Sequence, residues 1–319
     1  MSRLRILASA FALGSPGGNQ RSIQSWTRAL ADHDVVLVYR RFDDGPYGDF
    51  GPNVTLVPDW RVLRPRFSRP LSWWRAAALL TGPRGHFHAY LRFSNSLELT
   101  AGRGANVRAI MPAGDHLAGA EAGYDVALSQ SEDGRRLLSD TSKHRVCLPP
   151  TYAIASSSEP VEGLPDRFVL TVFNPYAAVK GFDDLVACAA ASPLPIVWAH
   201  RSRPGEAVDA PPGIIAVADA SPDQLRWLYE TCASYLSVSR SEGYGWAIAD
   251  AILHGRPVIS RRVGVLASLP TDAQGLHLFR DVTEATAILG RGEWESPDPD
   301  LIPPPSAASA TLEALVADA

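Results

Sequence analysis

The sequence predicts an α/β protein made of two halves, each with a parallel β-sheet covered by helices. Short apolar runs alternate with helical patterns along the chain, which is typical of β-α-β units. The alternation stops in Pro149–Pro165, a segment rich in Pro, Ser and Glu, and then starts again. A length of 319 residues is enough for two domains that each bury a core.

The expected elements follow this alternation in order. In the first half we expect strands at Leu4–Ser9, Val35–Tyr39, Val107–Met111 and Val126–Leu128, and a helix at Ser22–Ala31. In the second half we expect strands at Phe168–Phe173, Ile196–Ala199, Ile214–Val217, Tyr235–Val238 and Pro257–Ser260, and helices at Phe182–Ala191, Gly245–His254 and Ser306–Ala319. A further helix should begin at Ser221, because serine caps a helix, proline fits its first position and Gln224 can complete a capping box. We therefore expect domains over 1–150 and 151–304, and a final helix over 305–319 for which packing on the first domain is one option.

The composition excludes several classes of protein. Hydrophobic residues make up 46% of the chain and charged residues 20%, which is ordinary for a soluble globular protein. A net charge of −4 gives no general attraction to nucleic acid. The three cysteines, Cys147, Cys188 and Cys232, are far apart, which favours a reducing compartment over a disulfide framework or a zinc site. No run approaches the roughly 20 apolar residues of a membrane span, and no signal peptide is apparent, so we expect a cytoplasmic protein.

The most informative segment is Ser239–Asp250, which follows one expected strand and begins the next helix. Gly243 and Gly245 leave room for a ligand close to the backbone, and a helix start attracts a phosphate group. Asp250 should lie roughly 7.5 Å along the helix from Gly245, and it is the only charged residue in Trp246–Leu253. A lone carboxylate among apolar residues needs a partner. Ribose hydroxyl groups and a neighbouring backbone group are the two alternatives.

A second informative segment is Phe173–Gly181, which follows the first expected strand of the second half. It contains Lys180, one of only two lysines in a chain that otherwise uses arginine for positive charge. A compact ammonium group suits contact with a phosphate as a point charge. A solvated lysine at a helix start is the alternative.

Ser239–Asp250, continued through His254–Ile259, resembles the donor-site motif of the retaining GT-B glycosyltransferases of family 4. That motif has two acids separated by seven residues, usually two glutamates, and here the pair is Glu242 and Asp250. The resemblance implies a GT-B fold, in which two Rossmann-like domains face each other across a cleft. It also implies the retaining transfer of a sugar from a nucleotide-diphosphate sugar, held by the C-terminal domain, to an acceptor.

The resemblance also implies roles for individual residues. Glu242 would contact hydroxyl groups of the donor sugar, and Lys180 would bind the donor diphosphate. Asp250 would contact the nucleotide ribose, through a longer or water-bridged contact because Asp is one methylene shorter than Glu. The other donor contacts that it implies are Asn174, Gly243, Tyr244 and Gly245.

Two features concern the charge of this site. Many family members carry an arginine five residues before the lysine, but this chain has Pro175 there, so the second cation is missing or comes from Arg201 or Arg203. Asp298 and Asp300 match a D-x-D metal pattern, but they lie in a Pro-rich loop near the C-terminus and follow no nucleotide-binding strand. We therefore expect no metal and no other cofactor, with cationic and backbone groups stabilising charge instead.

In the first half, Gly17 and Gly18 resemble the Gly-Gly loop that family members bring close to the acceptor and the donor phosphate, although an ordinary glycine-rich turn is the alternative. His116 follows an expected strand, where family members often have a histidine that faces the donor sugar, and a structural histidine is the alternative. The segment Arg61–Arg75 has five arginines, aromatic residues and no acid. This pattern suits either an anionic membrane surface on the inner face or a phosphate-bearing acceptor, or else a loop leading into a core helix.

The expected partners are a nucleotide sugar and an acceptor that is a sugar, a lipid-linked molecule or a small molecule. Two further classes of function stay open. One is a nucleotide-sugar epimerase or hydrolase of the same fold, and the other is a non-catalytic partner subunit that resembles a glycosyltransferase.

Overall fold

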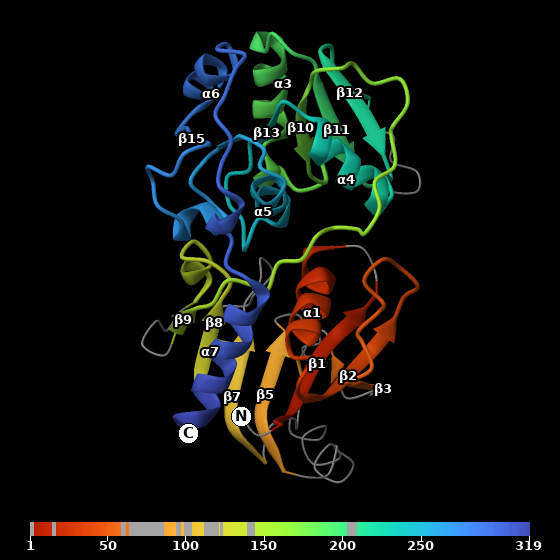
Figure 1. Ribbon diagram of the computed structural model, residues 1–319, viewed down its shortest axis with the longest axis vertical. Coiled ribbons are helices and arrows are strands. Elements are labelled where there is room, and N and C mark those ends of the chain that lie inside the picture. The colour runs from red at the N-terminus through yellow and green to blue at the C-terminus, as the bar shows by residue number, and fades with distance from the viewer. Residues whose placement is uncertain are drawn as a thin grey trace. The chain divides into compact units, whose positions relative to one another are not determined.

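The computed structural model describes residues 3–14, 17–58, 62–63, 86–93, 97–98, 104–111, 121, 124–138, 144–202 and 209–319. The chain divides into two compact units, which Figure 1 colours along the sequence. Unit 1 comprises Met1–Thr151 and Pro303–Ala319, and unit 2 comprises Tyr152–Ile302. Among the described residues, no helix is both long and apolar enough to cross a membrane.

Unit 1 contains a seven-stranded parallel sheet with the strand order β3-β2-β1-β5-β7-β8-β9. Its strands are β1 (Arg5–Leu13), β2 (Asp34–Phe42), β3 (Val54–Pro58), β5 (Phe87–Phe93), β7 (Ala105–Met111), β8 (Val126–Ser129) and β9 (His144–Val146). Two short strands, β4 (Val62–Leu63) and β6 (Leu97–Glu98), form a separate antiparallel pair. The helical segments are α1 (Gly18–Ala29), η1 (Gly134–Leu137) and α7 (Pro305–Ala317).

Helix α1 begins four residues before the expected Ser22, at Gly18, the second residue of the glycine pair. Its buried face carries small polar residues and Trp26, which is why an apolar pattern alone placed its start too late. The central strand β5 was not among the expected elements. Its sequence, FHAYLRF, contains His88 and Arg92, which interrupt the apolar run even though Arg92 is buried in the structure.

Helix α7 belongs to unit 1, although it lies at the far end of the sequence. Its apolar residues Ala308, Leu312 and Leu315 are part of the same core cluster as strands β1, β2, β5 and β7. A polar contact adds to this packing, because His33 Nε2 lies 2.9 Å from Glu313 Oε1. His33 Nδ1 accepts the backbone N–H of Leu4 at 3.3 Å, so the imidazole connects the helix to the first strand.

Replacing Leu312 with alanine should lower the free energy of unfolding by about 3 kcal/mol, because Leu312 is fully buried and its loss leaves a cavity. Urea denaturation followed by circular dichroism would measure this change. Val186→Ala is the matched control, since it shortens a helical aliphatic side chain that is exposed, and it should change stability by about 0.5 kcal/mol at most. Equal effects in the two variants would contradict the packing of α7 on unit 1.

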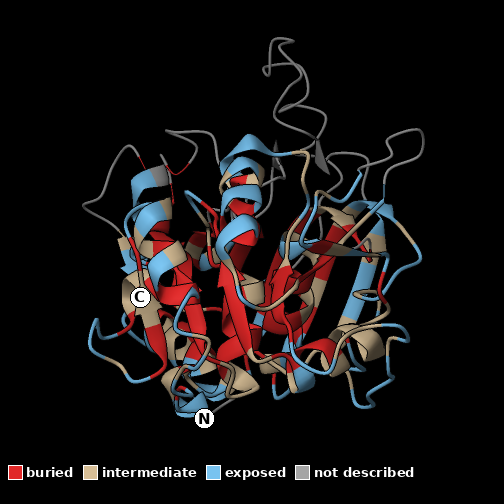
Figure 2. Ribbon diagram, turned by 90° about the horizontal axis from the view of Figure 1, so that it is seen from above, coloured by how far each residue is buried: buried red, intermediate tan, exposed pale blue. Residues whose placement is uncertain are grey.

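Unit 2 contains a six-stranded parallel sheet with the order β12-β11-β10-β13-β14-β15. Its strands are β10 (Val169–Val172), β11 (Ile196–His200), β12 (Ile214–Ala218), β13 (Ser234–Ser237), β14 (Val258–Ser260) and β15 (Leu276–Leu278). Its helices are α3 (Phe182–Ala191), α4 (Pro222–Thr231), α5 (Trp246–Leu253) and α6 (Val282–Leu289), with the 3₁₀ segments η2 (Ala178–Lys180), η3 (Gly264–Ser268) and η4 (Pro299–Leu301). Figure 2 shows that buried positions concentrate on the strands, whereas the outer faces of the helices are exposed.

Two local predictions for unit 2 are confirmed. Helix α4 begins after Ser221 with a complete capping box, in which the Ser221 hydroxyl accepts from Gln224 N–H and the Gln224 side chain accepts from Ser221 N–H. Helix α3 has the expected bounds, Phe182–Ala191.

Cys147, Cys188 and Cys232 are buried free thiols. His116 lies outside the described residues, and so does Arg61–Arg75 apart from the backbone of β4.

Candidate functional site

The strand order of unit 2 reverses between β10 and β13. From β10 the chain continues outward to β11 and β12, and it then returns to place β13, β14 and β15 on the other side. In open parallel sheets, ligands bind at the carboxyl ends of the strands that flank such a reversal. The loops that follow β10 and β13 are therefore the first place to look for a site, and they contain Lys180 and Glu242.

The loop after β10 is held in place by aromatic packing at its start. The Trp198 indole N–H donates to the carbonyl of Phe173 at 3.1 Å, and the two rings lie 5.6 Å apart. The loop then forms the short η2 turn, which ends at Lys180. Gly181 follows with φ = 72°, a left-handed conformation that favours glycine. A Cβ at this position would lie 2.6 Å from the carbonyl oxygen of Val238, so the two loops are in close contact here.

The loop after β13 brings Glu242 to Lys180. Lys180 Nζ donates to Glu242 Oε1 at 2.6 Å. The Lys180 and Glu242 side chains are 26% and 16% exposed, so the contact is partly shielded from solvent. The structure thus places a cation and an anion, 62 residues apart in the sequence, at the reversal point of the sheet.

The same loop leads into helix α5, whose N-cap is Gly245 with φ = 83°. Because glycine has no side chain, the N-terminal N–H groups of α5 are not capped by their own N-cap residue. Gly264, with φ = 55°, packs against the other side of this loop. A Cβ at Gly264 would clash with the carbonyl of Tyr244 and approach Glu242 Cβ to 2.9 Å. These glycines let three loops approach closely around Glu242 and the start of α5.

Asp250 lies on α5 and is 3% exposed. Its backbone carbonyl accepts from His254 N–H at 3.0 Å and lies 2.8 Å from His254 Nδ1. Tyr235 of β13 is also buried, and this burial, with the negative charges of Glu242 and Asp250, raises the pKa of its phenol above the ordinary value. Tyr235, which the sequence did not single out, is thus a buried phenol whose ionisation is opposed by the charges of both acids of the pair.

The comparisons with known proteins agree with this architecture. No family model and no curated protein matches the sequence. AviGT4, a glycosyltransferase involved in avilamycin A biosynthesis, matches with a TM-score of 0.62 and 15% identity over 99% of each chain. HepE of Anabaena, solved with UDP-glucose, matches with a TM-score of 0.62 and 14% identity over 99% of each chain. Sucrose-phosphate synthase of Thermosynechococcus elongatus matches with a TM-score of 0.58 and 15% identity over 99% of this chain and 94% of its own.

The chain has the GT-B fold. The fold class predicted from the sequence is therefore confirmed. Sequence identities this low establish the fold alone, so membership of family 4 and the retaining mechanism stay predictions.

The expected site residues of this GT-B chain fall into two groups. Lys180, Glu242, Asp250 and the run Gly243–Gly245 lie on or beside the loops that meet at the sheet reversal of unit 2. Tyr244 within that run is buried, and its ring packs edge-on against Trp246 at 4.9 Å. Asn174 is exposed at the start of the loop after β10.

Gly17 and Gly18 form the second group, because they lie in unit 1 at the start of α1. In this unit the strand order also reverses, between β1 and β5, and the glycine pair follows β1. The pair therefore occupies the position in unit 1 that the Lys180 loop occupies in unit 2.

The structure describes one of the two candidates for a second cation. Arg201 Nη1 lies 3.9 Å from Asp219 Oδ1, and Arg203 is outside the described residues. Two arginines that the sequence analysis did not consider, Arg240 and Arg261, lie in the loops after β13 and β14 and bind Asp184. The spacing of Arg240, two residues before Glu242, was the signal that could have found it.

The described part of the chain contains no cluster of three or more His, Cys, Asp or Glu side chains that could hold a metal ion. Asp298 has a structural role, since its carboxylate accepts the backbone N–H of Asp300 at 3.0 Å and caps the turn η4. Both residues of the D-x-D pattern are exposed.

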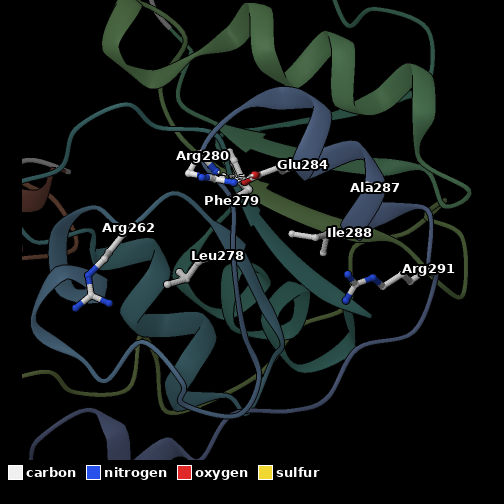
Figure 3. A pocket seen from close by; sticks show the side chains of 8 residues that line it. All are labelled: Arg262, Leu278, Phe279, Arg280, Glu284, Ala287, Ile288 and Arg291. Carbon is white, nitrogen blue, oxygen red and sulfur yellow. Dashed lines mark hydrogen bonds and ion pairs between the residues drawn. The ribbon is translucent and has the colours of Figure 1, made fainter.

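A groove of about 560 Å³ lies between β15 and α6. Its lining residues are Arg262, Leu278, Phe279, Arg280, Glu284, Ala287, Ile288 and Arg291, which Figure 3 shows as sticks. Arg280 faces Glu284 in an ion pair, and Arg262 donates to the carbonyls of Ala267 and Leu269. Because these two arginines are already engaged and none of the expected site residues lines the groove, we assign no ligand to it.

Proposed function

We propose that this protein is a nucleotide-sugar-dependent glycosyltransferase whose donor binds at the carboxyl ends of β10 and β13 in unit 2. The observation that supports this proposal best is the contact of Lys180 with Glu242 at the reversal point of the sheet. A donor of this class needs a cation for its diphosphate and an acceptor of hydrogen bonds for its sugar hydroxyls. The Lys180–Glu242 pair offers both within one hydrogen-bond length.

The diphosphate is the group that gains negative charge when the sugar departs. An ammonium group and a helix N-terminus are the two elements that stabilise such charge without a metal ion. Lys180 supplies the first, and the start of α5 after Gly245 supplies the second. We propose that the backbone of Gly243–Gly245 contacts the diphosphate, and that Tyr244 and Asn174 line the donor site.

The remaining roles follow the resemblance. Asp250 would bind the nucleotide ribose, Gly17 and Gly18 would lie close to the acceptor and the donor phosphate, and His116 would face the donor sugar. Transfer would retain the anomeric configuration through attack on the face from which the leaving group departs. In this mechanism the leaving diphosphate helps to take the acceptor proton, so the protein acts mainly by positioning both substrates and by stabilising charge.

The first experiment is a thermal-shift screen with UDP, GDP, ADP, CDP and dTDP and with their common sugar conjugates. A nucleotide that binds the folded state raises the melting temperature by mass action, and saturation at 100 times Kd adds about 2.7 kcal/mol of stability. The selected donor is then incubated with a panel of sugar, lipid-linked and small-molecule acceptors. Transfer with retained anomeric configuration, followed by NMR, would support the proposal, and no response to any nucleotide would contradict it.

The same assay separates the two alternatives. Turnover of the donor without an acceptor would identify a hydrolase or an epimerase. Binding of the donor with neither transfer nor turnover would identify a non-catalytic subunit, for which the Pro175 and Asp250 departures from the family motif are the motivation.

Activity should persist in excess EDTA. Lys180 and a helix N-terminus would stabilise the diphosphate, and Asp298 of the Asp298–Asp300 stretch is engaged in capping the η4 turn. The measurement is the initial rate of transfer before and after extensive dialysis against EDTA. Activity that disappears and returns with Mn²⁺ or Mg²⁺ would contradict a metal-independent mechanism.

A further inference from the structure

Four charged side chains meet near Lys180 and Glu242, two from the first turn of α3 and two from the loops after β13 and β14. Asp184, in the first turn of α3, lies 2.8 Å from Arg261 Nη2 and 3.2 Å from Arg240 Nη2. Arg240 also lies 2.6 Å from Asp183 Oδ2. Asp184 thus bridges an arginine from the loop after β13 to an arginine that directly follows β14.

The backbone takes part in the same arrangement. Arg240 N–H donates to the carbonyl of Val179 at 2.8 Å, which joins the residue before Lys180 to the loop that carries Glu242. Arg261 Nη1 donates to the carbonyl of Val238 at 2.6 Å. This is the same carbonyl that the left-handed Gly181 approaches so closely that a Cβ would lie 2.6 Å away. Side-chain and backbone contacts therefore fix the residues on both sides of Lys180 against the loop that leads to Glu242.

The burial of these groups indicates which ion pair contributes most to holding the loops together. The side chains of Asp184 and Arg261 are 13% and 17% exposed, whereas those of Asp183 and Arg240 are 72% and 43% exposed. Exposed ion pairs contribute little, whereas removing one partner of a buried pair leaves an uncompensated charge. The Asp184–Arg261 contact is therefore the one that holds the loops together.

We propose that Asp184, Arg240 and Arg261 form a clamp that positions Lys180 against Glu242. Two acids and two arginines give the cluster, Asp183 included, no net charge. Together with Asp183 the clamp is therefore neutral, so it acts through geometry and adds no net positive charge for a diphosphate. Its members are positioning residues, and only its consequence for catalysis rests on the proposed function.

The composition of the chain offers a direct probe of this geometry. Lys180 and Lys143 are the only lysines, so limited acetylation with isotope-labelled acetic anhydride and peptide mass spectrometry reports on Lys180, with Lys143 as the internal reference. An ammonium group held against a carboxylate reacts slowly. Asp184→Asn should raise the acetylation rate of Lys180 relative to Lys143 at least threefold. Glu242→Gln, which removes the partner itself, sets the upper limit of this rise.

Three further variants separate the positioning of Lys180 from the effects of losing any ion pair in unit 2 or of changing the net charge. Glu230→Gln removes another arginine-paired carboxylate of unit 2, 2.7 Å from Arg226, and should leave Lys180 unchanged. Asp184→Asn combined with Arg261→Gln keeps the net charge, and it should still raise the Lys180 rate because the bridge is gone. Arg261→Lys keeps one contact and should give an intermediate rate. If Lys180 in the charge-balanced double variant is acetylated at the wild-type rate, the proposed clamp is wrong.

Folding and catalysis are followed in the same variants. If Asp184→Asn does not fold, Arg240→Gln carries the test, because the Arg240 side chain is 43% exposed and its loss should raise the Lys180 rate by a smaller factor. For the folded variants, we expect kcat of transfer to fall at least tenfold while KM for the donor changes less than threefold. A raised Lys180 rate in a protein that shows no transfer would support the clamp and contradict the transferase. Transfer by the wild type, with an unchanged acetylation rate of Lys180 in every clamp variant, would support the transferase and contradict the clamp.

Discussion

Lys180→Ala should lower kcat/KM for sugar transfer by about 100-fold, which corresponds to about 3 kcal/mol of lost transition-state stabilisation. The reason is that negative charge develops on the diphosphate as the sugar leaves, and Lys180 is the side-chain cation that lies against Glu242 at the sheet reversal. The change should appear mainly in kcat, because a charge that grows in the transition state is stabilised more there than in the bound substrate. Steady-state kinetics with the donor identified by thermal shift measures both constants.

The matched control is Arg280→Ala, which removes a surface cation from the same unit. Arg280 pairs with Glu284 and its side chain is 89% exposed, so its loss should leave transfer within twofold of the wild type. Lys180→Arg should recover only part of the activity, because a planar guanidinium cannot replace a compact ammonium group in the same space. Near-normal turnover by Lys180→Ala would remove Lys180 from the mechanism.

Substitution of Glu242 should mainly lower the rate of transfer, whereas substitution of Asp250 should mainly weaken binding of the nucleotide. Glu242→Gln should reduce transfer by about 100-fold while binding of the free nucleoside diphosphate is kept or strengthened. Glu242 holds Lys180 at 2.6 Å, so removing its charge releases the ammonium group for the diphosphate. Asp250→Asn should instead weaken the nucleotide sugar and the free nucleotide together by about tenfold, since both contain the ribose and a hydrogen bond to a carboxylate contributes about 1.5–3 kcal/mol.

Calorimetry with the free nucleoside diphosphate and kinetics with the full donor distinguish these outcomes. The isosteric amides are chosen because Asp250 is 3% exposed, and a shorter side chain would add a cavity to the lost charge. Equal losses of nucleotide affinity in the two variants would show that the division of roles between sugar and ribose is wrong.

Much of the fold could be predicted because its determinants are local. The capping box at Ser221 depends on residues within one turn of a helix, and it is present as predicted. Strand β10 (Val169–Val172) lies within the expected strand Phe168–Phe173, and β13 (Ser234–Ser237) overlaps the expected strand Tyr235–Val238, because largely apolar stretches mark the centre of a parallel sheet. Strand β5 was missed because Arg92 and His88 interrupt its pattern, and only the tertiary environment decides that an arginine there is buried.

The sequence by itself determined which chemical groups this protein has available: a lone lysine in a loop, two acids separated by seven residues, and glycines where close approach is needed. Those features depend on residue type and short spacing, and neither changes with folding. Only the tertiary structure decided that Lys180 and Glu242 touch, that Asp184 joins Arg240 to Arg261, and that helix α7 completes the core of unit 1. Each of these contacts joins residues far apart in the chain, and parallel strand pairing, which brings such residues together, follows from the packing of the whole sheet rather than from any local pattern.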